Sequence, residues 1–121
     1  MNERQHAYQR GHAAEHRCAL LLSLEGWRIL ARRYCSSVGK IDLIAKRGKI
    51  VTAIEVKAWH SLMEALEAVM PHQRHRTERA AAAFLSQHPK WRNLDFRFDV
   101  MAAIPRQWPK HVTDAWRPET D

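Results

Sequence analysis

Residues 39–57 read GKIDLIAKRGKIVTAIEVK, and the rest of the chain is organised around this stretch. Apolar and polar residues alternate on both sides of Gly48, and β-branched residues are dense in the second half. This pattern predicts two antiparallel strands joined by a tight turn. A turn of even length at Gly48 pairs Arg47 with Ile50, and this pair sets the register of the hairpin.

Counting outwards from that turn places two acidic residues, Asp42 and Glu55, opposite each other. Side chains at opposite positions lie roughly 5 Å apart at Cβ, and like charges there destabilise a sheet unless something offsets them. A divalent cation would offset them. Because the strand period is two, Lys57 lies on the same face as Glu55. The pattern therefore predicts a site of two acids and a lysine, and the competing interpretation is the solvated face of an amphipathic hairpin.

Length and cysteine content set bounds on the class of protein. The chain has 121 residues, enough for one domain whose core needs no disulfide or metal. Its two cysteines form no CxxC pair, which favours a reducing compartment. No signal-peptide pattern precedes the first predicted helix, and its longest apolar run is far shorter than the roughly 20 residues that span a bilayer. We therefore expect a cytoplasmic protein with no membrane partner.

The charge of the chain favours an anionic partner. The net charge is +7 and the isoelectric point is about 10.0, values for which nucleic acid is the default partner. Three arginines, Arg74, Arg76 and Arg79, lie on a predicted helix that follows the hairpin. Such a run is most often a solvated helix face. Its place directly after the two acids and the lysine favours contacts with phosphate instead.

Hydrophobic periodicity and turn residues predict seven elements in the order α-β-β-β-α-α-β. They are a helix at 2–25, a strand at 27–33, the two hairpin strands within 39–57, a short helix beginning near 62, a second helix at 71–87 and a strand at 95–104. This order predicts an α/β sandwich with a mixed sheet at its centre. We expect one domain over residues 1–104 and an irregular tail over 105–121, which contains three prolines and two tryptophans.

The first predicted helix carries an acid that allows two interpretations. Helical spacing places Glu15 on the apolar face, where it either reaches water from the edge of the stripe or points inward toward the hairpin acids. Residues 12–16, HAAEH, also fit the HxxEH pattern of inverzincin peptidases, in which two histidines bind zinc. His12 and His16 would need a third ligand, and a chance match is unsurprising in a chain with eight histidines.

Short motifs along the chain match a known family in their order and spacing. The motifs are Gly11-x-x-Ala14-Glu15, GWRILAR at 26–32, GKIDLIA at 39–45, EVK at 55–57, AV at 68–69 and RFDV at 97–100. Over residues 7–104 the chain resembles the YraN family of small bacterial proteins. That family is itself similar to archaeal Holliday-junction resolvases and restriction-endonuclease-like nucleases. The most specific part is IDLIA followed by EVK.

The resemblance implies a restriction-endonuclease-like three-layer α/β sandwich and a metal-dependent endonuclease acting on structured or branched DNA. Carried over by position, Asp42 and Glu55 would be ligands of Mg²⁺ or Mn²⁺, and Glu15 would add a third carboxylate from the first helix. Lys57 would orient or activate the attacking water and stabilise charge at the phosphate. Gln73 would hydrogen-bond a water or phosphate. Relatives of this kind often act as dimers, so a homodimer is expected by analogy.

Three positions depart from the family pattern. Lys40 stands where the family has glutamate, and it could either grip a phosphate or weaken metal binding. Trp59 replaces a basic or polar residue after EVK, as a base-stacking platform or a packing residue. Gln73 replaces a lysine. A second hypothesis therefore stays open, in which the chain is a nucleic-acid-binding relative with weak or no catalysis.

Overall fold

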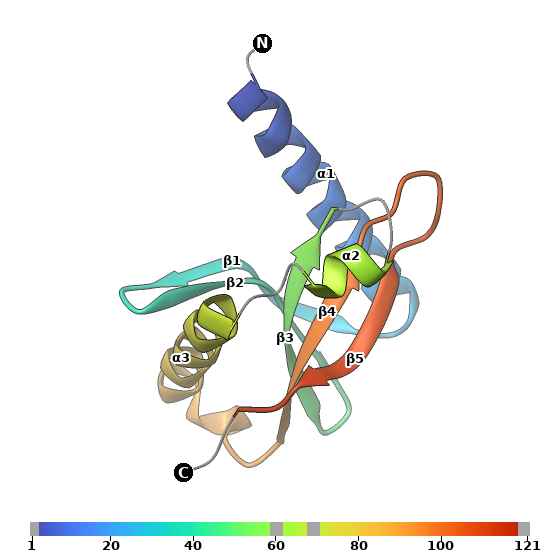
Figure 1. Cartoon of the computed structure of the whole chain (residues 1–121). Helices are drawn as coiled ribbons and strands as arrows, with labels where there is room; N and C mark the ends of the chain where they lie inside the picture. Colours follow the sequence, from blue (N-terminus) through green and yellow to red (C-terminus); the bar gives the residue numbers. More distant parts are fainter. Residues whose placement is uncertain (1–2, 59–61, 68–70, 119–121) are drawn as a thin grey trace.

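The computed structural model describes residues 3–58, 62–67 and 71–118, and it describes residues 3–10 and 67 by their backbone only. The elements are α1 (Glu3–Leu24), β1 (Arg28–Ser36), β2 (Gly39–Arg47), β3 (Ile50–Lys57), α2 (Leu62–Glu67), α3 (Pro71–Gln87), the 3₁₀ helix η1 (Pro89–Trp91), β4 (Asp95–Ala102) and β5 (Lys110–Trp116) (Figure 1). The predicted order is confirmed as far as β4, and β5 is added to it.

The strands form one mixed sheet in the order β1-β2-β3-β4-β5. Pairing is antiparallel except between β3 and β4, which run parallel. Parallel neighbours need a long crossover connection, and here it carries α2 and α3. The crossover places α3 beside β2, the strand that carries Asp42 of the predicted site.

The hairpin has the predicted register. Arg47 pairs with Ile50, and the ladder runs outward to Leu43 and Ile54. Gly48 has φ +60°, the left-handed conformation that a tight hairpin turn requires and glycine adopts without strain. The next two positions beyond the last pair are Asp42 and Glu55, as the count from the turn predicts.

Alternate strand residues enter two separate cores, and this makes the molecule a three-layer sandwich. One core joins α1 to the sheet and contains Ala14, Cys18, Leu22, Leu43, Ala45, Ile54 and Met101. The other joins α3 to the opposite face and contains Ile44, Val51, Ala53, Ala80, Phe84 and Val100. The alternation follows from the strand period of two. Ile41 belongs to the α3 core, unlike Leu43, and lies beyond the last pair of the β2–β3 ladder.

The prediction of an irregular C-terminal tail is wrong for the segment Lys110–Trp116, which forms β5 against β4. The prolines that suggested irregular structure stand outside the strand, where they remove no ladder hydrogen bond. Trp116 is buried and stacks on Phe98 with ring centroids 5.3 Å apart. Trp108, by contrast, is 60% exposed.

A buried ion-pair network holds β5 to the sheet. The carboxylate of Asp99 is fully buried and lies 2.9 Å from Arg97 Nη2 and 2.7 Å from His111 Nε2. The backbone N–H of Asp114 donates to its other oxygen at 2.8 Å. Burial by itself raises the pKa of Asp99, but the hydrogen bonds from His111, Arg97 and Asp114 outweigh it and hold the pKa at about 2.

The start of β2 is pressed against α3. A Cβ placed on Gly39 would lie 2.1 Å from the carbonyl oxygen of Arg76. Only glycine permits this approach, which brings α3 close to the end of the hairpin. None of the helices in the described ranges is long and apolar enough to cross a membrane.

Candidate functional site

The predicted acids and lysine meet in a cavity of about 240 Å³ between the hairpin and α3. Its lining consists of Lys40, Asp42, Glu55, Val56, Lys57, Gln73, Arg76 and Thr77. The hairpin register supplies the first five, and the α3 crossover brings the last three. Sequence positions 40 to 77 thus converge because β2 and β3 pair with the predicted register and α3 packs on β2.

Asp42 is held in place by the backbone of the neighbouring strand. The N–H of Val56 donates a hydrogen bond to Asp42 Oδ2 at 2.8 Å. Burial raises the pKa of Asp42 above its ordinary value, while this hydrogen bond and the charges of Lys40 and Lys57 oppose the rise. The carboxylate is therefore both fixed in direction and poorly solvated.

Glu55 is the more deeply buried acid in the cavity, with 7% of its surface exposed. Thr77 Oγ1 lies 2.9 Å from Glu55 Oε1 and 3.0 Å from the carbonyl oxygen of Gln73. Burial, and next the negative charge of Asp42, raise the pKa of Glu55 to about 7. Two ionised acids in this cavity repel each other, so bringing a cation between them would lower the energy of both.

Lys57 and Gln73 face each other across the cavity. Lys57 Nζ donates a hydrogen bond to Gln73 Oε1 at 3.3 Å. Gln73 and Lys57, both predicted as site residues from the sequence, thus contact each other directly. This contact positions a positive charge beside the two acids without neutralising it, because the amide is uncharged.

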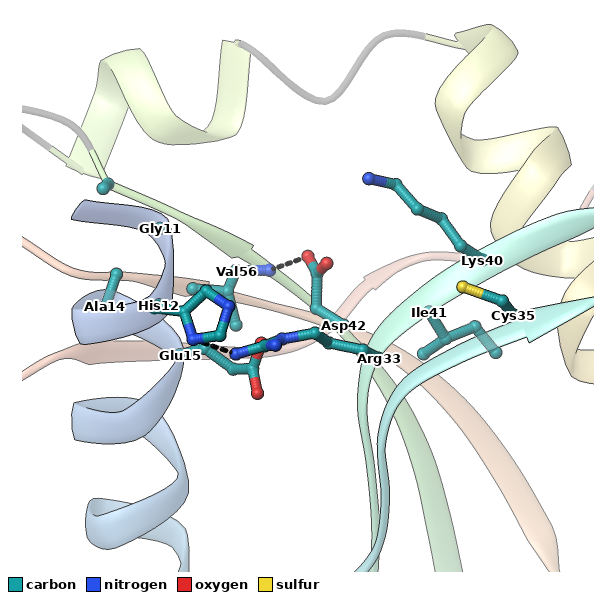
Figure 2. A pocket seen from close by; sticks show the side chains of 11 residues that line it. Gly11, His12, Ala14, Glu15, Arg33, Cys35, Lys40, Ile41, Asp42 and Val56 are labelled. Atoms are coloured by element: carbon teal, nitrogen blue, oxygen red, sulfur yellow. Dashed lines mark hydrogen bonds and ion pairs between the residues drawn. The ribbon is translucent and has the colours of Figure 1, made fainter. Parts of the chain in front are cut away.

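The third predicted carboxylate lies in an adjoining cavity of about 340 Å³ between α1 and the β1–β2 end of the sheet (Figure 2). Glu15 is 7% exposed, and Arg33 Nε lies 2.8 Å from its Oε2. Arg33 also contacts His12 Nδ1 through its Nη2. Asp42 lines both cavities, whereas Glu55 and Lys57 line only the first of these two. Glu15 is therefore inward-facing, as one interpretation predicted, and its carboxylate is engaged by a guanidinium.

The basic run on α3 does not act as one surface. Arg76 lines the cavity of the two acids. Arg74 lies over the ring of Trp116, 5.8 Å from its centroid, and Arg79 Nε lies 3.4 Å from the carbonyl oxygen of Val38. These two arginines contact other parts of the molecule, and only Arg76 of the three lines this cavity. Trp59, predicted to contact nucleic acid, lies outside the described residues.

Two residues at the site were not predicted as functional. Thr77 could have been found, because it follows Gln73 by four residues and shares its helix face. Arg33 had no such signal. Its backbone has φ +51°, and it follows a register irregularity between Ile29 and Ala31 that the strand pattern does not reveal.

The histidine pattern of α1 gains no support from the geometry. His16 is exposed, and Glu15 of the same pattern is ion-paired with Arg33. Among the side chains described, those of residues 11–58, 62–66 and 71–118, no three His, Cys, Asp or Glu gather closely enough to hold a metal by themselves. A zinc peptidase needs three protein ligands.

Comparison with known proteins identifies relatives over most of the chain. Residues 14–103 match the model of the Uncharacterised protein family UPF0102. A UPF0102 protein of Parvibaculum lavamentivorans is 47% identical over 112 residues, which are 93% of this chain and 84% of that protein. One from Mesorhizobium japonicum is 49% identical over 113 residues, 93% and 90% of the two chains. One from Brucella canis is 48% identical over 106 residues, 88% and 84%.

Proposed function

The chain belongs to the UPF0102 family, the YraN family that its motifs indicate, and from its site we propose that it hydrolyses phosphodiester bonds in nucleic acid with a bound Mg²⁺ or Mn²⁺. The observation that carries this proposal is the convergence of Asp42, Glu55 and Lys57 in one cavity, with Gln73 and Thr77 of α3 behind them. Structured or branched DNA is the substrate class that the family resemblance favours.

The two acids suit a hard divalent cation. Both are carboxylates, both are partly or fully buried, and burial raises the pKa of each. Mg²⁺ prefers oxygen ligands, and it commonly binds through one or two carboxylates while waters and substrate phosphates complete its shell. A pair of acids without a third protein ligand therefore fits Mg²⁺ or Mn²⁺ better than zinc.

The cation would supply Lewis-acid stabilisation of the charge that develops on the phosphate during hydrolysis. The residues of the chain do the remaining work. Asp42, fixed by the Val56 N–H, and Glu55, fixed by Thr77, present their oxygens in one place. Lys57, held by Gln73, carries a mobile point charge that orients the attacking water or contacts a phosphate oxygen.

The rim of the cavity suits a polyanion. Lys40 is exposed beside Asp42, and Arg76 lines the cavity from α3. Contacts of such side chains with phosphate position a nucleic acid without reading its sequence. The chain's net charge of +7 favours the same partner. By analogy with junction-cleaving relatives we expect two copies to act together, and the free Cys18 and Cys35 favour a cytoplasmic location.

A second function, nucleic-acid binding with little or no catalysis, is favoured by one specific observation. Lys40 stands beside the acids where the family usually has glutamate, and its charge lowers the pKa of both Asp42 and Glu55. A lysine at this position competes with a cation for the two carboxylates. The enzyme hypothesis requires that a divalent ion at millimolar concentration displaces the Lys40 ammonium group from the carboxylates of Asp42 and Glu55.

A cleavage assay on a four-way junction and on supercoiled plasmid, with Mg²⁺, Mn²⁺ or EDTA, separates the two functions. We expect metal-dependent cleavage that Asp42→Asn and Glu55→Gln abolish while DNA affinity falls less than threefold. Asp95→Asn, which removes an exposed acid, is the matched control and should cleave normally. Binding without cleavage in either metal would establish the second function. Stoichiometric zinc in the purified protein would revive the peptidase interpretation.

A further inference from the structure

The cavity between α1 and the β1–β2 end of the sheet is a second site with its own charged residues. Arg33, Lys40 and His12 bring positive charge or hydrogen-bond donors to its lining, and Asp42 borders it. Its volume of about 340 Å³ falls in the range of about 300–1,000 Å³ that small-ligand sites occupy. Building on the proposed function, we infer that this cavity binds a phosphate of the nucleic acid through Arg33, and that Glu15 is the positioning residue that holds Arg33 there.

The exposures of the two side chains assign their roles. The side chain of Glu15 is 9% exposed and that of Arg33 is 46% exposed. Figure 2 shows the guanidinium of Arg33 beside Glu15 and His12 on the α1 side of the cavity, and all three residues line it. A charge-assisted bond of 2.8 Å between Arg33 Nε and Glu15 Oε2 fixes the planar guanidinium, whose Nη2 also contacts His12 Nδ1. A planar, fixed fork of donors is the geometry that phosphate recognition favours.

The backbone of β1 adds a second sign that Arg33 is placed for function. Its φ of +51° is uncommon for a residue with a side chain, and such conformations concentrate at binding and active sites. The flanking pairs Arg32–Leu43 and Tyr34–Ile41 put Arg33 directly across from Asp42. Arg33, Asp42 and Glu55 thus occupy one row across three strands, and a phosphate held by Arg33 would lie next to Asp42, which lines the same cavity.

The same geometry separates Glu15 from the metal ligands. Glu15 lines the cavity of Arg33, whereas Glu55 and Lys57 line the neighbouring one. If Glu15 instead bound the proposed divalent cation, the guanidinium of Arg33 would lose its ion-pair partner. Lys40, Asp42 and Val56 line both cavities, so the two cavities adjoin along these three residues and a nucleic-acid backbone could pass from one to the other.

The helix leaves the mouth of this cavity open. Gly11 lines it, and a Cβ placed on Gly11 would meet nothing within 4 Å. A side chain there can therefore enter the cavity without disturbing the fold. Gly11→Glu should weaken DNA binding at least fivefold by placing a negative charge at the phosphate.

The deciding experiment measures the salt dependence of DNA affinity for the full chain without divalent metal. Each phosphate contact contributes about 0.9 to the slope of log K against log salt concentration for duplex DNA. We expect Arg33→Gln and Glu15→Gln to lower the slope by roughly one contact each, and the double variant to lower it no further, because the two residues act as one unit. Arg32→Gln removes the neighbouring exposed charge on β1 and should leave the slope unchanged.

Two further measurements separate the alternatives. Arg33→Gln leaves the buried carboxylate of Glu15 without its partner and could fold poorly. The double variant removes both charges, and Arg33→Lys keeps the positive charge and should restore most of the salt slope. These two variants keep the test valid if Arg33→Gln does not fold. Calorimetry with Mn²⁺ should give wild-type affinity for Glu15→Gln; a tenfold loss confined to this variant would make Glu15 a metal ligand and overturn the inference. An unchanged slope in both variants, or no DNA binding by the wild type, would overturn it as well. Because no cleavage is measured, failure of the nuclease proposal is seen separately in the junction assay.

Discussion

Thr77 Oγ1 of α3 lies 2.9 Å from Oε1 of Glu55 on β3, and this contact joins the helix to the strand at the buried carboxylate. The hydroxyl lowers the pKa of Glu55 against the larger effects of burial and of Asp42. Since Thr77 also lies 3.0 Å from the Gln73 carbonyl, one side chain couples the acid to the helix turn that carries the partner of Lys57. The state of Glu55 therefore depends on the position of α3.

Replacing Thr77 by valine tests this coupling. The change preserves shape and removes a hydrogen bond worth about 1 kcal/mol, so the pKa of Glu55 should rise by somewhat less than one unit. The acidic limb of the pH dependence of Mn²⁺ affinity should move to higher pH by the same amount. Calorimetric titrations from pH 5.5 to 8.5 measure it. Thr113→Val, on exposed β5, should leave the profile where it is.

The raised pKa of Glu55 predicts a pH-dependent penalty on folding without metal. Its pKa is about 7 in the folded chain against 4.5 in the reference state, so the folded state binds more protons between these values. Stability should fall as pH rises from about 5 to 8, by on the order of 2 kcal/mol. Urea unfolding in EDTA should show this fall in the wild type and a much smaller one in Glu55→Gln. A Glu55→Gln variant that is less stable than the wild type at pH 8 would contradict this.

The lowered pKa of Asp99 predicts that the free energy of unfolding decreases as the pH falls in the acid range, the opposite of the effect of Glu55. Its pKa is lowered from 3.8 to about 2, so the stabilisation is complete above pH 4 and is lost as pH falls through 2. The shift corresponds to about 2 kcal/mol. Asp99→Asn should lower the free energy of unfolding at pH 7 by about 2–4 kcal/mol, since it leaves Arg97 and His111 without their buried partner. Its stability should then change little between pH 4 and 2, which thermal unfolding measures.

A side chain at Gly39 should disturb the packing of α3 on β2 and, through α3, the candidate site. A methyl group at this position meets the Arg76 carbonyl at 2.1 Å, so Gly39→Ala must push α3 away from β2. We expect a loss of about 1–3 kcal/mol in unfolding free energy, together with weaker Mn²⁺ binding as Gln73 and Thr77 move. Gly11→Ala, where the added methyl meets no atom within 4 Å, is the control and should be neutral or stabilising by up to about 1 kcal/mol. Equal stability of the two variants would contradict the close approach.

The charge of Lys40 should weaken metal binding and strengthen nucleic-acid binding. Lys40→Glu restores the family's usual residue, removes a charge that lowers the pKa of Asp42 and Glu55, and adds a carboxylate beside them. Mn²⁺ affinity should rise by about tenfold, an electrostatic change of roughly 1.4 kcal/mol, while DNA affinity without metal falls. Calorimetry and fluorescence anisotropy measure the two. Lys110→Glu, on the far edge strand, should affect neither property more than twofold.

Much of the site was predictable because it depends on local rules. Strand period and turn length fix which residues of a hairpin oppose each other, so Asp42, Glu55 and Lys57 could be placed by counting from Gly48. Gln73 was expected at the site from the family resemblance, and it lines the cavity from α3. Element order likewise predicted a mixed sheet between helices, since a strand, a helical crossover and a strand make a parallel pair.

The missed features depend on contacts between segments distant in sequence. β5 forms because Asp99 binds Arg97, His111 and the Asp114 backbone, and no local pattern in a proline-containing segment reveals that network. Arg33 reaches Glu15 across 18 positions from a strand irregularity that alternation cannot show. The basic run of α3 looked like one surface because sequence shows only its charges, while packing decides which way each arginine faces.

The sequence by itself thus determined the strand register, the family and the row of acids, since each follows from periodicity or from short motifs. The tertiary structure alone decided that Glu15 is paired with Arg33, that only Arg76 of three arginines reaches the cavity, and that Lys110–Trp116 forms a fifth strand of the sheet. The physical reason is the range of the interactions. Backbone geometry repeats every two or 3.6 residues and can be counted, whereas ion pairs and packing contacts are set by distances in space that the fold creates.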